Sequence, residues 1–194
     1  MNFPFKKYRQ YSDEKLLVFI SEGNQKAFDE LYLRYGKKLH YYFYQAFSKD
    51  SHKADDFLQD LFVKIFQNSS QFDPQRKFST WIYSIAANMC KNEFRSMQVR
   101  SSEKLSIGIA TIFQTQVEDT ITKFDLQLFG QHLDLALQNL SEDQRTTFIL
   151  RYQQELPIKE IAEIMDCAEG TVKSRLYYAL QILSEKLAPF NPNT

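Results

Sequence analysis

The stretch that most constrains the fold is residues 155–187, which carries two helical periodicities on either side of a short break. The apolar positions are Ile158, Ile161, Ala162 and Met165 before the break, and Val172, Leu176, Ala179, Leu180, Leu183 and Leu187 after it. At about 100° per residue, each set falls on one face of a helix. The break at residues 166–168 has the length of the turn in helix-turn-helix units. The sequence therefore predicts two amphipathic helices joined by a tight turn.

The second of these helices has a polar face that suits a DNA major groove. Its candidate DNA-binding residues are Thr171, Lys173, Ser174, Arg175 and Tyr178. Small hydroxyl residues let a helix approach the groove closely, where Lys and Arg contact phosphates or guanine edges. An ordinary amphipathic helix with a solvated polar face has the same pattern. The helix-turn-helix alone leaves both interpretations open.

Capping residues predict where other helices begin and end. Ser12 is a good N-cap for a helix that stops at Gly23, and Asn24 can cap the next helix. In the C-terminal half, Ser141 followed by Gln144 forms a capping box at the start of another helix. These signals predict helices in both halves of the chain.

A change in composition separates the two halves. From Ser101 to about Lys123, Ser, Thr, Gln and isolated β-branched residues follow one another without a helical period. We find no hairpin signal and no internal repeat in the sequence. We expect an all-α protein with two helical domains, at residues 1–100 and 126–194, joined by a flexible linker at residues 101–125.

Charge is balanced over the whole chain but unevenly distributed. Residues 1–100 hold 16 Lys and Arg against 11 Asp and Glu, whereas residues 101–194 hold 8 against 13. This asymmetry suggests different partners for the two halves. Because the acidic half carries the helix-turn-helix, its intrinsic affinity for DNA should be weak.

The remaining composition favours a cytoplasmic protein without a metal. Cys90 and Cys167 lie far apart with no CxxC pattern, and His40, His52 and His132 are scattered. We expect free thiols in a reducing cytoplasm. No apolar run approaches the roughly 18 residues of a membrane span, and the N-terminus lacks the apolar core of a secretory signal.

One helix of the N-terminal half, expected to start near Ser51, carries an acidic face. It contains Asp55, Asp56, Gln59 and Asp60. Lys64, at i+4 from Asp60, is the only cation four residues after a carboxylate of this set. The pattern fits a solvated surface or a face that meets a cationic partner.

Two stretches resemble RNA polymerase sigma factors. The C-terminal resemblance is carried by Leu140, Arg145, Phe148, Leu150, Arg151, Glu160, Ile161, Ala162, Gly170, Thr171, Val172, Lys173, Ser174, Arg175 and Leu176. The N-terminal one is carried by Asp55, Asp56, Gln59, Asp60, Phe62, Phe78, Thr80, Trp81, Ile82, Tyr83, Ile85, Ala86, Asn88 and Arg95. The chain resembles the small extracytoplasmic-function (ECF) group of the sigma-70 family, whose members consist of regions 2 and 4 alone.

The resemblance implies three binding surfaces. Core polymerase would bind Asp55, Asp56, Gln59, Asp60 and Phe62, through the coiled coil of its largest subunit. The −10 promoter element would contact Phe72, Arg76, Lys77, Trp81, Asn88, Lys91 and Arg95, which are aromatic, cationic and polar residues of the kind that hold unstacked bases. The −35 element would contact the five residues of the second helix. Trp81 also fits a core position, and Phe72 could simply cover its loop.

The resemblance also implies the partners. They are core RNA polymerase, including its flap, promoter DNA in duplex and single-stranded form, and an anti-sigma factor. It implies no catalytic residue, cofactor or small-molecule substrate. Ser84 and Ala87 stand where many family members carry Arg, which implies two fewer phosphate contacts.

Two other classes of protein carry helix-turn-helix units. A stand-alone repressor or activator would bind its operator without polymerase, and would leave the acidic face without a purpose. A recombinase or nuclease would need a nucleophile ringed by Arg, or carboxylates around a metal. The only candidate cluster for a metal is Asp55, Asp56 and Asp60, on a helix without a histidine ligand.

Overall fold

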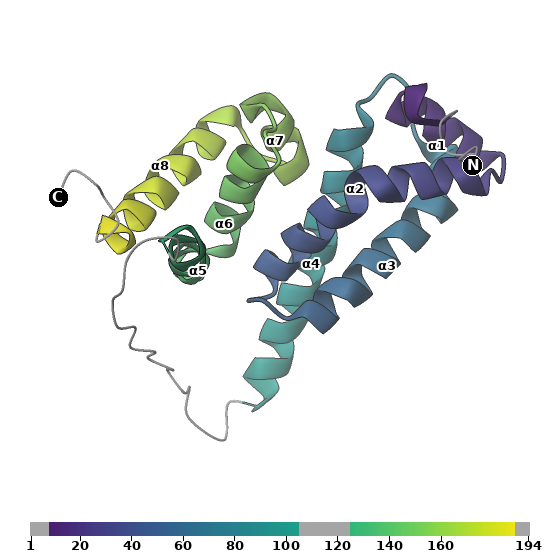
Figure 1. Ribbon diagram of the computed structural model, residues 1–194. Coiled ribbons are helices and arrows are strands. Elements are labelled where there is room, and N and C mark those ends of the chain that lie inside the picture. Colours follow the sequence, from purple (N-terminus) through teal and green to yellow (C-terminus); the bar gives the residue numbers. More distant parts are fainter. Residues whose placement is uncertain (1–7, 105–124, 189–194) are drawn as a thin grey trace.

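The computed structural model describes residues 8–104 and 125–188, and the side chains of residues 8–100 and 129–188. These ranges contain helices and no strand, as the sequence predicted (Figure 1). The α-helices are α1 (Asp13–Ser21), α2 (Gln25–Ala46), α3 (Ser51–Asn68), α4 (Phe78–Lys104), α5 (Asp125–Leu137), α6 (Glu142–Phe148), α7 (Ile158–Met165) and α8 (Glu169–Lys186). α4 continues past its expected end near Arg100, and the rest of the predicted linker, residues 105–124, lies outside the described residues.

The predicted caps of the first two helices are confirmed. The Ser12 hydroxyl accepts a hydrogen bond from the Lys15 N–H at 3.3 Å, and the Asn24 side chain accepts one from the Ala27 N–H at 3.2 Å. Gly23 between them has a φ of +82°, which other residues rarely adopt. The turn from α1 into α2 is therefore encoded locally.

Helices α1 to α4 enclose an aromatic-rich core. α2 and α3 form a helical hairpin, and α1 and α4 pack against it. Each helix contributes fully buried side chains: Leu17 from α1, Tyr42 and Phe43 from α2, Leu61 from α3 and Ile82 from α4. Burial of these large side chains provides the main driving force for folding of this half.

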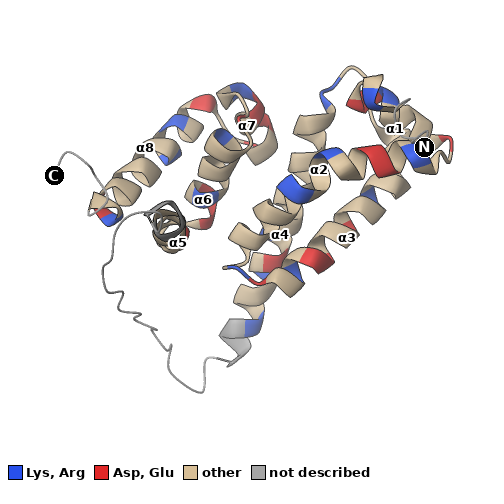
Figure 2. Cartoon of the chain, in the orientation of Figure 1, with Lys and Arg blue, Asp and Glu red and all other residues tan. Residues whose placement is uncertain are grey.

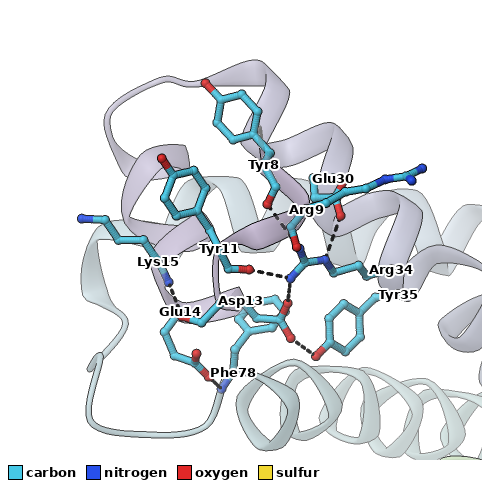
Figure 3. A network of polar contacts seen from close by, with 11 residues as sticks. Tyr8, Arg9, Tyr11, Asp13, Glu14, Lys15, Glu30, Arg34, Tyr35 and Phe78 are labelled. Carbon is cyan, nitrogen blue, oxygen red and sulfur yellow. Dashed lines mark hydrogen bonds and ion pairs between the residues drawn. The ribbon is translucent and has the colours of Figure 1, made fainter. Parts of the chain in front are cut away.

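Arg34 of α2 ties the N-terminal segment to this bundle (Figure 3). Its guanidinium donates to the backbone carbonyls of Tyr8, Arg9 and Tyr11 at 3.0–3.3 Å. It also forms ion pairs with Asp13 at 2.6 Å and with Glu30 at 2.9 Å. One planar cation thus satisfies three carbonyls and two carboxylates, which a lysine ammonium could not do.

We expect Arg34→Ala to destabilise the protein by about 1–2 kcal/mol, because charge-assisted hydrogen bonds are lost and Glu30 stays buried without its partner. Hydrogen exchange should show the amides of residues 8–13 exchanging faster than those of α3. Lys37→Ala, on the same helix and without a recorded ion pair, is the control. Equal protection of residues 8–13 in both variants would contradict this role of Arg34.

Helices α5 to α8 form the C-terminal unit with the predicted helix-turn-helix. The capping box is confirmed, since Gln144 N–H donates to the Ser141 hydroxyl and Ser141 N–H to the Gln144 side chain. After α6, residues 149–153 form one π-helical turn. Asp166 ends α7 in the left-handed conformation, with φ of +50°, and makes the turn into α8. Val172 and Ala179 of α8 are fully buried, as their spacing predicted.

The two helical units pack on each other rather than standing apart. α4 contacts α7, and α2 contacts α6. The hydrophobic core that begins in α1 continues without interruption through Ile161, Met165 and Val172. A smaller core joins α5, α6 and α8. The sequence predicted both units but gave no sign of this shared core.

Candidate functional site

The acidic face of α3 is exposed as predicted. Figure 2 shows acidic residues on this helix, and Asp55, Asp56, Gln59 and Asp60 are all solvent-exposed. Asp55 is not isolated, because its carboxylate lies 3.1 Å from Nε2 of His40 on α2. Among the described residues, Asp56 and Asp60 have no ion-pair partner. Two carboxylates therefore remain available to a cationic partner.

An apolar groove of about 780 Å³ lies beside this face, between the start of α2 and the end of α3. Its apolar lining residues are Phe28, Tyr32, Phe62, Val63 and Phe66. Phe62 is only 4% exposed and packs on Phe28 and Tyr32, so it forms the floor of the groove. The exposed lining residues are Tyr32, Val63 and Phe66, which are 47%, 52% and 55% exposed.

Sequence reasoning missed Val63. It lies four residues after Gln59 and therefore on the polar face of α3, where its isopropyl group is an apolar exception. An apolar residue within an otherwise charged helical face is the signal that could have identified the groove.

The candidate −10 residues divide into a buried and an exposed set. Phe72 is 8% exposed, and its ring packs on those of Phe78 and Trp81, with centroids 6.2 and 5.1 Å away. Phe72 therefore covers the loop, which was the second interpretation of this residue, and it is not free to stack on a base. Trp81 is half-buried, with one side open to a cavity. Arg76, Lys77, Asn88 and Arg95 are exposed, and Lys91 is half-buried.

Several of these residues face α7 of the C-terminal unit. Lys77 forms an ion pair with Glu160, and the Thr80 hydroxyl donates to the same carboxylate at 3.3 Å. The hydrogen bond that Lys77 donates to the Glu160 carboxylate raises the pKa of Lys77 above its ordinary value. Lys91 lies 3.5 Å from the Met165 carbonyl oxygen at the end of α7. In this arrangement the two units meet on the predicted −10 surface.

The exposed face of α8 contains three of the five predicted −35 residues. Lys173, Ser174 and Tyr178 are exposed and Thr171 is half-buried. Arg175 instead turns inward, where it pairs with Asp143 of α6 and contacts the Cys167 sulfur. Its guanidinium fixes α8 on α6 and is not free for DNA in this conformation.

Tyr177 is an exposed residue that sequence reasoning did not select. It is 66% exposed and lies three residues after Ser174, so both side chains share a helical face. Its ring packs edge-on against that of Tyr178, with centroids 5.4 Å apart. The exposed face of α8 therefore carries a pair of tyrosines next to Ser174.

The thiols and acidic residues suggest no catalytic centre in the described part of the chain. Burial raises the pKa of the Cys90 thiol to about 12, which keeps it protonated and unreactive. No group of His, Cys, Asp and Glu side chains within residues 8–100 and 129–188 could hold a metal ion. In the same ranges, no helix combines the length and hydropathy that a membrane span needs.

Comparison with known families explains this combination of surfaces. Residues 31–100 match the model for sigma-70 region 2, and residues 131–183 match that for sigma-70 region 4. The chain is 30% identical over 191 residues to the ECF RNA polymerase sigma-E factor of Escherichia coli K12, covering 93% of this chain and 96% of that protein. The chain belongs to the ECF group of the sigma-70 family.

Other relatives of this ECF sigma factor support the same family assignment. It is 29% identical over 193 residues to the ECF RNA polymerase sigma-E factor of Haemophilus influenzae, covering 93% of this chain and 97% of that protein. The solved structure of CnrH in complex with the cytosolic domain of CnrY has the same fold, with a TM-score of 0.68 and 23% identity, covering 92% of this chain and 99% of that one. The Bartonella quintana sigma factor RpoE, in complex with the anti-sigma factor NepR, also gives a TM-score of 0.68, with 24% identity and coverage of 84% and 98%.

The protein is thus an alternative sigma factor, which directs RNA polymerase to promoters. Its family comprises non-catalytic initiation factors that bind polymerase and promoter DNA. The matches give no support to a stand-alone repressor or activator.

Proposed function

We propose that core RNA polymerase binds the acidic face of α3 together with the groove beside it. The observation that carries this proposal is that two unpaired carboxylates, Asp56 and Asp60, border an open groove lined by exposed Val63 and Phe66. Such a surface suits a helical partner with cations along one edge and an apolar residue that fills the groove. By resemblance to the family, that partner would be the coiled coil of the largest subunit.

The other two surfaces bind the promoter. Lys173, Ser174, Tyr177 and Tyr178 of α8 would contact the −35 duplex through its major groove. Cations and Trp81 around the start of α4 would hold the melted −10 strand, since single strands bind to cations and aromatic surfaces. The polymerase performs the chemistry, so this chain needs no catalytic residue.

Two further partners rest on the resemblance to the family. Region 4 would contact the polymerase flap, and an anti-sigma factor would hold the protein inactive, as NepR is bound to RpoE in the similar structure. With these partners, the protein would act in the cytoplasm, where polymerase and promoters are.

Reconstitution with bacterial core RNA polymerase tests the proposal. Immobilised wild-type protein should retain core polymerase, and Asp56→Arg combined with Gln59→Ala should not. Run-off transcription of genomic DNA by the reconstituted enzyme should give discrete starts and reveal the promoter sequence. Failure to retain core, combined with tight binding of the isolated protein to duplex DNA, would contradict the proposal.

A further inference from the structure

We propose that α8 recognises the −35 element mainly through the methyl groups of two neighbouring thymines, with Tyr177 and Tyr178 as the residues that determine specificity. The inference rests on the proposed contact between α8 and the −35 duplex, and it adds which feature of the bases is read there. It follows from which side chains of α8 face outward, from the intramolecular contacts that engage the polar ones, and from the apolar surface that remains.

The outward face of α8 is set by its buried side. At about 100° per residue, Ser174 lies at the centre of the face opposite the buried positions, which are Val172, Leu176, Ala179 and Leu183. Tyr177 and Tyr178 come three and four residues after Ser174 and lie on either side of it, at 66% and 55% exposed. Gly170 comes one turn before Ser174, so two small residues allow a close approach to a groove. The tyrosines are therefore the largest side chains that a major groove would meet.

The polar groups near this face are largely engaged within the protein. Arg175, the one arginine of α8, forms an ion pair with Asp143 and donates to the Cys167 sulfur at 3.5 Å. The Ser174 hydroxyl donates to the Thr171 carbonyl at 2.9 Å, so it can only accept a hydrogen bond from a base. Guanine is most often read by an arginine that donates two hydrogen bonds. In this conformation α8 has no arginine free for that contact.

Lys173 is the cation in the first half of α8 that remains available. It is exposed and has no ion-pair partner within residues 8–100 and 129–188. As the neighbour of Ser174, it lies at the edge of the outward face and not at its centre. A lysine ammonium is a point charge that suits phosphates, and phosphate contacts position a protein without reading sequence. Lys173 therefore anchors α8, and specificity depends on the tyrosines.

The two tyrosine rings form an apolar surface that matches thymine. In the major groove, the C5-methyl of thymine is the group that apolar side chains contact. The rings pack edge-on, with centroids 5.4 Å apart and planes at 76° to each other. Each ring offers a large, rigid contact area at a small entropic cost. Successive base pairs are roughly 3.4 Å apart, so the pair of rings can cover the methyls of two neighbouring thymines.

Neither ring contributes to the interior of the protein. Tyr177 and Tyr178 belong to neither of the two hydrophobic cores of the described residues, and their recorded ring contact is with each other. Both can be replaced without leaving a cavity, because substitutions at exposed positions have little effect on stability. A changed affinity for promoter DNA in such variants therefore reports on the contact with DNA.

The test uses holoenzyme, reconstituted from core polymerase and the full-length protein, and a promoter revealed by run-off transcription of genomic DNA. The thymines of its −35 element are replaced by deoxyuridine, which removes the C5-methyl and preserves base pairing. Anisotropy of a fluorescein-labelled duplex at fixed salt gives the affinity. Wild-type holoenzyme should bind the substituted duplex about tenfold more weakly, because burial of one methyl strengthens binding about fourfold. Deoxyuridine in the spacer between the two elements is the control and should have no effect.

Two double variants separate the rings from their hydroxyls. Tyr177→Ala with Tyr178→Ala should bind the natural promoter about tenfold more weakly than wild type, and should bind the natural and substituted duplexes equally. Tyr177→Phe with Tyr178→Phe keeps the rings and should keep the preference for thymine. Both variants should retain core polymerase and have unchanged helical circular dichroism.

Three results would overturn the inference. Equal binding of both duplexes by wild type would show that the methyls are not read, although the −35 assignment would stand. A preference for thymine that persists in the double alanine variant would assign the methyl contact to other residues. A −35 element without neighbouring thymines on either strand would exclude the contact at the outset. Failure to retain core polymerase or to give discrete starts would instead contradict the proposed function, and this inference with it.

Discussion

Val63→Asp is expected to reduce the affinity for core RNA polymerase by about a hundredfold, while leaving the stability of the free protein nearly unchanged. Val63 is 52% exposed on the wall of the α2–α3 groove, so an aspartate there remains hydrated in the free protein. In the complex, the new carboxylate would be buried in an apolar contact without a partner, at a cost of several kcal/mol. Titration of fluorescently labelled protein with core polymerase would measure the loss.

Leu33→Asp provides a matched control for this prediction. Leu33 is also an exposed apolar residue, at 63%, and lies on α2 of the same bundle outside the groove. The same change of charge and polarity there should leave the affinity within about twofold of the wild type, because a surface substitution away from the contact has little effect. Equal losses in the two variants would show that charge, and not the groove, determines binding. No loss in either would place the polymerase contact elsewhere.

Local signals predicted the fold well. Helix caps such as Ser12, Asn24 and Ser141 work through hydrogen bonds within three residues, so sequence alone identifies them. The periodicity of α8 correctly predicted the buried positions Val172, Leu176, Ala179 and Leu183, but it also predicted Leu180 on the buried face, and Leu180 is 43% exposed. It also placed Lys173, Ser174 and Tyr178 on the outside, as the structure has them.

The departures arise from contacts between residues distant in sequence. Lys77 and Glu160 are 83 residues apart, and Arg175 and Asp143 are 32 apart, so no helical pattern links them. A periodicity shows which face of a helix is polar, but it cannot show what covers that face. For this reason Arg175 was expected on DNA, whereas the structure places it against α6.

Arg145 illustrates such a long-range contact, and its loss should have the largest effect on stability. In the structure its guanidinium donates to the carbonyls of Leu137, Gln138 and Leu140 at the end of α5, at 3.0–3.4 Å. It also reaches the carbonyls of residues 45 and 46 at the end of α2, at 3.3 and 3.5 Å. One cation thus caps two helices from different regions.

This position suits a guanidinium for two reasons. The last carbonyls of a helix lack partners within the helix, and the helix dipole makes that end negative. Burial lowers the pKa of Arg145, but an arginine remains charged even so, because its ordinary pKa is very high. A lysine at this position would bring a single ammonium to carbonyls that are arranged around the planar guanidinium of arginine. It would leave several of these carbonyls without a hydrogen-bond donor.

We therefore expect Arg145→Ala to lower the free energy of unfolding by about 3 kcal/mol, and Arg145→Lys to recover less than half of that loss. Arg151→Ala is the control, because within residues 8–100 and 129–188 the Arg151 side chain makes one hydrogen bond, to the Leu156 carbonyl at 3.0 Å, and its loss should cost about 1 kcal/mol. Urea denaturation followed by circular dichroism gives the three values. Because Arg145 joins α2 to α5, its loss should also separate unfolding of the two regions into two transitions, whereas the control keeps one. A single transition in Arg145→Ala, at the midpoint of the control, would show that the shared hydrophobic core alone holds the regions together.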